Sequence, residues 1–224
     1  MLVAKRQRQP TPQPATPVAV ASVVAELAGR FDAGGPVGCG FPGVVRHGVI
    51  GTAANLDPAW LDTHAATLSS DTLGGRTVNV INDADAAGLA EIRFGAGAGQ
   101  PGVVVMITLG TGIGTAMFVD GILVPNTEFG HLMMDGTEAE RLASTRAKEQ
   151  NDLDWTQWTG HVLAFVKELE RLMWPDMFII GGGVSAEFQA FCESLRTVTP
   201  VAAAALGNDT GIVGAALAVS EDGA

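Results

Sequence analysis

The chain has 224 residues, of which 47% are hydrophobic, and it carries a formal net charge of −11 at pH 7. This length provides for one large core or two smaller lobes, and the apolar runs are all short or broken by polar residues and glycines. Surfaces that bind nucleic acid or anionic membranes need net basic patches, so the acidic balance argues against both partners. Any bound phosphate must be held locally, by backbone amides, a few Lys or Arg side chains, or a divalent cation.

The two cysteines, Cys39 and Cys192, are too few for a disulfide framework or a cysteine-rich metal site. No signal-peptide pattern precedes them. These two observations predict a cytoplasmic protein.

The first third of the chain predicts an extended link, a helix and a buried strand. Prolines spaced through residues 10–17 favour an extended conformation, and apolar residues at helical spacing predict a helix over residues 18–29. Residues 36–45 predict a strand that ends in the turn Gly40-Phe41-Pro42-Gly43. Glycines at such a position indicate either close approach to a ligand or a plain loop. A helix is then expected to start at Trp60.

Polar residues follow the strand predicted at residues 76–81. Asn82, Asp83 and Asp85 stand where this strand passes into an alanine-rich helix, which is where open α/β sheets usually place their chemistry. Asn or Asp at such a position often does no more than cap the helix. A single cap needs only one of the three, so a functional role is predicted for the others.

Residues 103–124 predict a β-hairpin, because two runs of β-branched and large apolar residues flank Thr108-Leu109-Gly110-Thr111-Gly112. Glycines at the apex would permit positive φ and let backbone N–H groups and threonine hydroxyls approach an anion. A tight turn with spare glycines is the alternative. Residues 177–185 repeat the pattern, with a buried strand that leads into Gly181-Gly182-Gly183.

Glu128, His131 and Glu140 follow the hairpin closely enough to form a metal site, a hydroxyl-binding cluster or a solvated face. Zinc is disfavoured because thiolates and further imidazoles are missing nearby and a closed structural site needs four ligands. The stretch from Asp154 to Glu170 then predicts a helix whose two tryptophans face the core. Its apolar residues in helical register are Val162, Phe165, Val166, Leu169 and Leu172. A final apolar helix over residues 210–219 is expected to be buried.

Together these segments resemble the ROK kinases, and within them the bacterial polyphosphate glucokinases. The matching segments are FPGVV, TAANLD, NDADAAGLAE, TLGTGIGTA, LVPNTEFGH, Ala139 to Ser144 as AExxAS, MFIIGGGVS and GIVGAA. The resemblance implies an α/β fold of the actin-like ATPase, ribonuclease H-like type, with two lobes. Residues 1–81 would form a truncated small lobe, residues 82–207 the large lobe with the sugar and phosphate loops, and residues 208–224 a terminal helix returning towards the small lobe.

The resemblance also implies the reaction, which is phosphoryl transfer from polyphosphate or ATP to the 6-hydroxyl of glucose. Mg²⁺ would accompany the donor, zinc would be absent, and the chain would form a homodimer. Asp83 would act as general base. The implied sugar-binding residues are Asn55, Asn82, Asp83, Glu128, His131 and Glu140. The implied phosphate-binding residues are Thr108, Gly110, Thr111, Gly112, Gly181, Gly182 and Gly183. Carboxylates and a neutral imidazole are suited to bind sugar hydroxyls.

The sequence departs from the family pattern at two places. Leu132-Met133-Met134-Asp135 follows His131 where zinc-binding relatives carry cysteines. The family's first phosphate hairpin, an Asp-Ile-Gly-Gly-Ser/Thr pattern, is missing, and residues 2–6 are expected to be the last strand of its sheet. The chain is therefore expected to lack one donor loop and to be a poor kinase. The alternative function is a catalytically impaired sugar-binding remnant or a sugar-sensing regulator. The preferred donor and the physiological sugar stay open.

Overall fold

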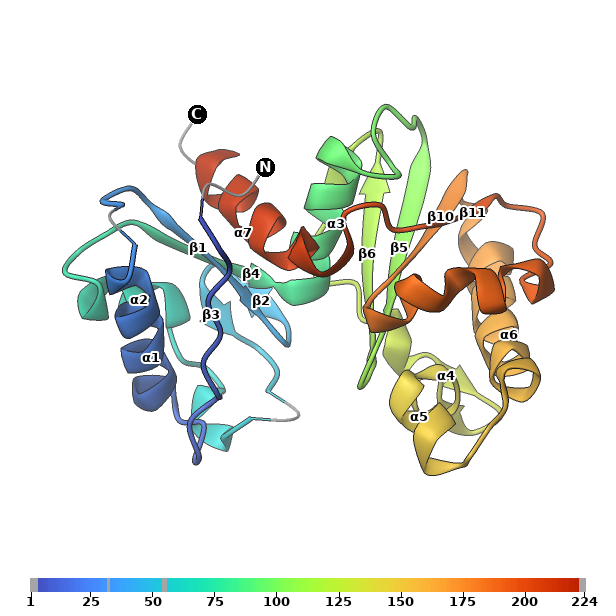
Figure 1. The fold of residues 1–224 in the computed structure, drawn as a ribbon, viewed down its shortest axis with the longest axis horizontal. Coiled ribbons are helices and arrows are strands. Elements are labelled where there is room, and N and C mark those ends of the chain that lie inside the picture. The colour runs from blue at the N-terminus through green and yellow to red at the C-terminus, as the bar shows by residue number, and fades with distance from the viewer. Residues whose placement is uncertain (1–3, 32, 54–55, 222–224) are drawn as a thin grey trace.

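The structure is a computed structural model that describes residues 4–31, 33–53 and 56–221, and it contains two main sheets with helices around and between them (Figure 1). The elements of the first part are α1 (Pro17–Gly29), β1 (Val37–Phe41), β2 (Val45–Arg46), β3 (Val49–Ile50), the 3₁₀ helix η1 (Pro58–Trp60), α2 (Ala65–Thr72) and β4 (Val78–Asn82). The elements of the rest are α3 (Asp83–Phe94), β5 (Val103–Leu109), β6 (Ile113–Val119), β7 (Ile122–Val124), η2 (Phe129–His131), β8 (Met133–Met134), β9 (Thr137–Glu138), α4 (Glu140–Ala143), α5 (Thr145–Gln150), α6 (Trp155–Met173), β10 (Met177–Gly181), η3 (Gly183–Ala190), η4 (Cys192–Ser194), β11 (Val201–Ala203), η5 (Gly207–Asp209) and α7 (Thr210–Glu221).

The smaller sheet pairs β1 with β4 in parallel, from Val37 opposite Val78 to Phe41 opposite Asn82. Helices α1 and α2 pack together beside it, and α7 packs against both strands. Trp60 anchors this part of the core, because its ring lies 4.9 Å from that of Phe41 and its indole N–H donates to the carbonyl of Ala15 at 2.8 Å.

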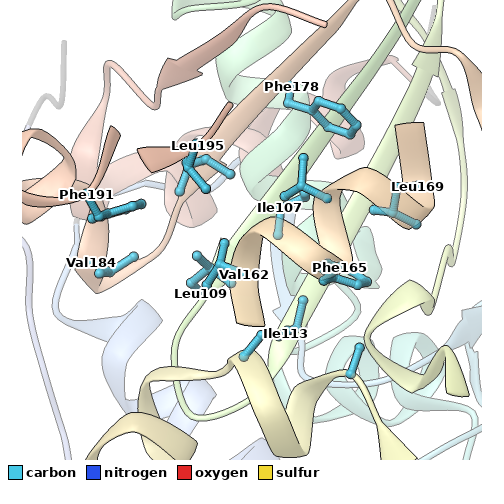
Figure 2. Packing of buried hydrophobic residues seen from close by; sticks show 14 of the residues in the cluster. Ile107, Leu109, Ile113, Val162, Phe165, Leu169, Phe178, Val184, Phe191 and Leu195 are labelled. Atoms are coloured by element: carbon cyan, nitrogen blue, oxygen red, sulfur yellow. The ribbon is translucent and has the colours of Figure 1, made fainter. Parts of the chain in front are cut away.

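The larger sheet has the order β11-β10-β5-β6-β7. Strands β10 and β11 run parallel to β5, whereas β6 and β7 continue as antiparallel hairpins. Alternate residues of β5 serve the two faces, as the two-residue period of a strand requires. Ile107 and Leu109 pack against α6, where they meet Phe165 (Figure 2). Val104 and Met106 belong to the opposite cluster, on the face that α3 covers.

Helices α3 and α7 lie between the two sheets and are in backbone contact (Figure 1). A Cβ on Gly214 of α7 would lie 1.5 Å from the carbonyl oxygen of Ala86 in α3. A Cβ on Gly38 of β1 would lie 1.8 Å from the carbonyl oxygen of Ala215. On the other side, Gly88 of α3 leaves room for the ring of Phe118 in β6. Three glycines therefore allow one pair of helices to join both sheets.

The predicted elements are largely confirmed, with three corrections. The chain at Trp60 is a short 3₁₀ turn capped by Asp57, and a helix begins only at Ala65, because Asp62 at φ +59° breaks the turn. No strand occurs within residues 4–31 and 33–36, so the strand expected at residues 2–6 is wrong for its described part. Leu172 is 52% exposed, since it lies off the buried stripe of α6.

No helix in the described part of the chain has the length and apolar character needed to cross a membrane. The predicted division into residues 1–81, 82–207 and 208–224 stays a prediction.

The contact between α3 and α7 predicts opposite outcomes for two glycines of the same helix. Gly214→Ala should lower the free energy of unfolding by about 1–3 kcal/mol or more, because its methyl group would overlap the Ala86 carbonyl. Gly211→Ala should be neutral or stabilise by up to about 1 kcal/mol, because its Cβ would meet no atom within 4 Å. Urea denaturation measures both, and equal unfolding midpoints would contradict the close contact.

Candidate active site

One cleft gathers most of the residues that the sequence pointed to. Its volume is about 410 Å³, which falls in the range of roughly 300–1,000 Å³ that small-molecule sites occupy. The lining residues are Pro42, Gly43, Thr52, Asn82, Asp83, Thr108, Gly110, Thr111, Gly112, Ile113, Gly114, Glu128, His131, Glu140 and Gly182. Ten of the predicted site residues thus share one cleft, although they come from segments far apart in the chain.

Asn82 holds together the three segments that meet at the end of β4. Its Oδ1 accepts from the backbone N–H groups of Ala84 and Asp85 at 2.8 and 3.0 Å, so it caps α3. Its Nδ2 donates to the Gly43 carbonyl at 3.1 Å and to Oε1 of Glu128 at 3.3 Å. The side chain is buried. Capping therefore falls to Asn82, and its role as a sugar ligand stays a prediction.

Three carboxylates, those of Asp83, Glu128 and Glu140, share the cleft. Burial by the cleft walls raises the pKa of Asp83, although its side chain is exposed to solvent on the open side. Burial also raises the pKa of Glu128, and the charges of Asp83 and Glu140 add to this rise, whereas His131 opposes it. Raised carboxyl pKa values bring proton transfer nearer to neutral pH, which suits a general base.

The turn Gly110-Thr111-Gly112 is fastened from both sides. The Gly110 N–H donates to the Gly112 carbonyl at 3.0 Å, and the Gly110 carbonyl accepts from the N–H and the hydroxyl of Thr145 at 2.9 and 2.6 Å. Neither Gly110 nor Gly112 has positive φ, so that part of the prediction is wrong. Glycine at 112 instead provides space, because a Cβ there would lie 2.6 Å from Oε2 of Glu140.

Of the three glycines Gly181, Gly182 and Gly183 at the end of β10, only Gly182 lines the cleft. Its φ is +82°, and a Cβ would lie 2.4 Å from the carbonyl oxygen of Leu109, so only glycine lets this loop meet the end of β5. Gly181 packs on the terminal methyl of Met106, and a Cβ on Gly183 would point into open space. Their predicted contact with phosphate is not tested, and the predicted sugar ligand Asn55 lies outside the described residues.

Several residues of this region were not predicted as site residues from the sequence. Pro42, Gly43 and Thr52 line the cleft, and the Gly-Phe-Pro-Gly turn was the signal for the first two. Thr52 accepts from the backbone N–H of Val44 at 2.9 Å, which shapes that turn. Glu138 also went unassigned, and its Oε1 lies 3.3 Å from Nδ1 of His131.

Asp85 and Asn126 form a link behind the cleft. Asp85 is 1% exposed and its Oδ2 accepts from the Asn126 N–H at 2.8 Å, while its Oδ1 has no partner among the residues that the structure describes. The Asn126 side chain then accepts from the Val45 N–H at 2.8 Å and donates to the Val45 carbonyl at 2.9 Å. Asp85 therefore holds the segment that leads to Glu128, and burial raises the pKa of its carboxyl to about 6.

His131, Glu138 and Glu140 bring ligand atoms within 4.8 Å of one another, which is close enough to hold a cation. A closed structural zinc site needs four ligands, usually including thiolates or more imidazoles. The three groups are fewer than that, and all are at least partly open to solvent. The absence of zinc stays a prediction.

Known proteins are similar to this chain in sequence and in fold. The sequence profile of the ROK family matches residues 1–148. The polyphosphate glucokinase of Mycobacterium tuberculosis is 49% identical over 221 residues, which cover 99% of this chain and 83% of that protein. The crystal structure of an inorganic polyphosphate/ATP-glucomannokinase from Arthrobacter sp. strain KM superposes with a TM-score of 0.95 at 48% identity, covering 99% of this chain and 90% of that one. A ROK family glucokinase from Streptomyces griseus, solved with glucose and AMPPNP, gives a TM-score of 0.79 at 26% identity and covers 94% of this chain and 90% of that one.

The two sheets, the helices between them and the glycine-lined cleft therefore define a protein with the actin-like ATPase fold of sugar kinases, which confirms the predicted fold class. The profile match covers more than half of the chain, and the mycobacterial relative matches nearly all of it. The chain belongs to the ROK family.

The buried Asp85 predicts a pH-dependent stability difference. Between about pH 4 and 6 the folded protein keeps a proton on Asp85 that the unfolded chain has released, because the pKa rises from 3.8 to about 6 on folding. The parent therefore loses stability through this group as pH rises across that window. Asp85→Asn should gain up to about 3 kcal/mol relative to the parent between about pH 4 and pH 7.

Urea denaturation at each pH measures this difference, with Asp71→Asn on the exposed side of α2 as control. The control should run parallel to the parent. If the free energy of unfolding of Asp85→Asn also ran parallel to that of the parent across this pH range, Asp85 would not contribute to the pH dependence of stability.

Proposed function

We propose that this protein is a glucokinase that transfers a phosphoryl group from polyphosphate or ATP to the 6-hydroxyl of glucose. The observation that carries the proposal is the cleft, in which Asp83, three groups suited to sugar hydroxyls and a glycine turn suited to phosphate lie together. The names of the relatives support it, because the similar mycobacterial protein is a polyphosphate glucokinase and the similar solved structure is a polyphosphate/ATP-glucomannokinase.

Asp83 is the proposed general base. It is the first residue of α3 and lines the cleft beside the phosphate turn. Its carboxylate would accept the proton of the 6-hydroxyl while the hydroxyl oxygen attacks the terminal phosphorus of the donor. The bond from that phosphorus to the bridging oxygen would break, and the shortened polyphosphate or ADP would leave with the electron pair of that bond. The raised pKa of Asp83 supports this role, because a base works best when its pKa lies close to the working pH.

The turn at residues 110–112 is the proposed site of the transferred phosphoryl group, with Thr108 and Gly182 beside it. Phosphoryl transfer depends mainly on positioning and on stabilising the negative charge of the transition state. Backbone N–H groups and threonine hydroxyls supply donors for this purpose. Fastening of the turn through Thr145 supports the role, because a fixed turn loses less entropy when phosphate binds.

The oxygen groups of this region suit Mg²⁺, which prefers carboxylate, hydroxyl, water and phosphate oxygens and is usually held by one or two carboxylates plus the substrate's phosphates. The hydroxyls of Thr108 and Thr111, which line the cleft, would hold the ion together with water and the phosphate oxygens of the donor, and Asp83 would stay free to act as base. Bound with the donor, the ion would offset the charge of the phosphates.

A coupled assay for glucose 6-phosphate, run with polyphosphate and with ATP, tests the proposed function. Each donor is assayed at the same glucose concentrations. Glucose 6-phosphate formation with either donor supports the proposal. Binding of glucose without turnover with both donors would favour the sugar-binding alternative instead.

We further propose that the protein is a cytoplasmic homodimer in which residues 1–81 form the small lobe and residues 82–207 the large lobe. Light scattering on the purified chain measures the oligomeric state, and a monomer mass would contradict the dimer.

Asp83→Asn should lower kcat about 10²–10⁴-fold, because the amide cannot accept the hydroxyl proton. The KM for glucose should change much less, since the amide oxygen can still bind a hydroxyl. Steady-state kinetics measure both constants, with Asp71→Asn as the control for a surface charge. Near-normal turnover in Asp83→Asn would contradict its role as base.

Glu128, His131 and Glu140 should respond together as sugar ligands. Replacing any one with Ala should weaken glucose binding by roughly 1–3 kcal/mol, because hydroxyls and buried partners lose their hydrogen bonds. Calorimetric titration measures the affinity, with exposed Glu149→Ala on α5 as control. Unchanged affinity in all three variants would mean that these side chains form a solvated face and do not bind the sugar.

Polyphosphate is predicted to be the better donor, and its use should fall steeply with added salt. A polyanion is attracted by local positive charge. Arg141 lies on α4, and Arg146 and Lys148 lie on α5. Thr145, the first residue of α5, donates a hydrogen bond to Gly110 of the phosphate turn. Salt screens such contacts. The KM for each donor, measured from low to high KCl, tests the prediction. A clear preference for ATP would contradict it.

A further inference from the structure

Glu138 contacts His131 on the side that faces away from Glu128. The Nδ1 of His131 lies 3.3 Å from Oε1 of Glu138, and the Nε2 lies 3.7 Å from Oε2 of Glu128. The second oxygen of Glu138 accepts from Nε of Arg141 at 3.0 Å. The imidazole therefore stands between two carboxylates, and one of these carboxylates is itself held by an arginine.

A short hairpin presents Glu138 to the imidazole. Strands β8 and β9 pair Met133 with Glu138, and the turn between them has Asp135 at φ +49° and Gly136 at φ +81°. These two positive φ values are those of a two-residue hairpin turn that matches strand twist. Ala139 then donates to the carbonyl of Leu132 at 2.8 Å. Because the backbone on both sides of Glu138 is paired, its side chain starts from a fixed position.

The 3.3 Å contact between Nδ1 of His131 and Oε1 of Glu138 is an ion-pair contact, and it bears on which imidazole nitrogen carries a proton. A neutral imidazole has one N–H donor and one acceptor nitrogen. A carboxylate can only accept, so Glu138 favours the proton on Nδ1 of His131. The Nε2 is then an acceptor beside the carboxylate of Glu128. At 3.7 Å these two atoms are too far apart for a hydrogen bond.

We propose that Glu138 is a positioning residue for the sugar, which holds His131 in the tautomer with Nδ1 protonated so that Nε2 accepts a hydrogen bond from a sugar hydroxyl. This inference rests on the proposed function, because it assigns the ligand of Nε2 as a sugar hydroxyl. Two acceptors side by side, Nε2 of His131 and Oε2 of Glu128, then select ligands that present two O–H donors. Glu138 acts through His131 and is not itself a sugar ligand.

The test replaces Glu138 with Ala and with Gln, and uses Glu168→Ala as a matched control. Glu168 forms the same kind of i,i+3 pair, with Arg171, and its side chain is 34% exposed against 31% for Glu138. Glu138→Ala should raise the KM for glucose about tenfold or more, with little change in kcat or in the KM for the donor. Glu138→Gln should fall between, because its amide oxygen can still accept from Nδ1. The control should match the parent.

Two further measurements separate positioning from a merely structural effect. In a His131→Ala background, Glu138→Ala should raise the KM for glucose no further, since its partner is gone. Nitrogen-15 NMR of labelled histidine should show His131 with Nδ1 protonated in the parent and a shift towards Nε2 protonation in Glu138→Ala. His131→Asn identifies the signal among the four histidines.

The NMR measurement needs no catalysis, so it tests the positioning role even if the chain phosphorylates no sugar. A parent His131 protonated on Nε2, or a tautomer unchanged by Glu138→Ala, would overturn the inference. A KM for glucose within twofold of the parent value in an active Glu138→Ala variant would also overturn it.

Discussion

The contact between the backbones of α3 and α7 is the constraint on which the rest of the structure depends. Each helix also packs on a different sheet, α7 on β1 and α3 on β6. Gly214 lets α7 approach α3, and Gly38 lets α7 approach β1, because a side chain at either position would overlap a carbonyl group. The two sheets are therefore held at a set distance, and the cleft exists between loops that they carry.

The start of α3 converts this packing into a functional site. Asn82 caps the helix and also holds the Gly43 carbonyl and the carboxylate of Glu128. A shift of α3 would therefore move Asp83, which is the proposed base, the glycine turn after β1 and the proposed sugar ligand Glu128 together. Buried Asp85, one turn on, extends the same control through Asn126 to Val45. The proposed chemistry depends on hydrogen bonds that are already made within the protein.

The sequence predicted best where the signal was local. Apolar periodicity identified α1, the β5–β6 hairpin and α6, and the change from an apolar strand to polar residues identified Asn82 and Asp83. It failed where a contact joins distant segments. The hydrogen bonds between the Asn126 side chain and the Val45 backbone could not be predicted from nearby residues. The same holds for the space that Gly112 leaves for the Glu140 side chain. The expected positive φ at Gly110 and Gly112 was wrong because the glycines there provide space and not an unusual backbone conformation.

The sequence by itself determined the fold class and most of the residues of the cleft, because strand and helix periods and the family motifs are local properties of the chain. Only the tertiary structure decided which of these residues meet. In the folded chain Asn82 is the residue that caps α3. Gly182 lines the cleft whereas Gly183 does not, and Glu138 contacts His131. Such choices depend on where separate elements come to lie after packing, and that is fixed by close contacts such as that of Gly214 with Ala86.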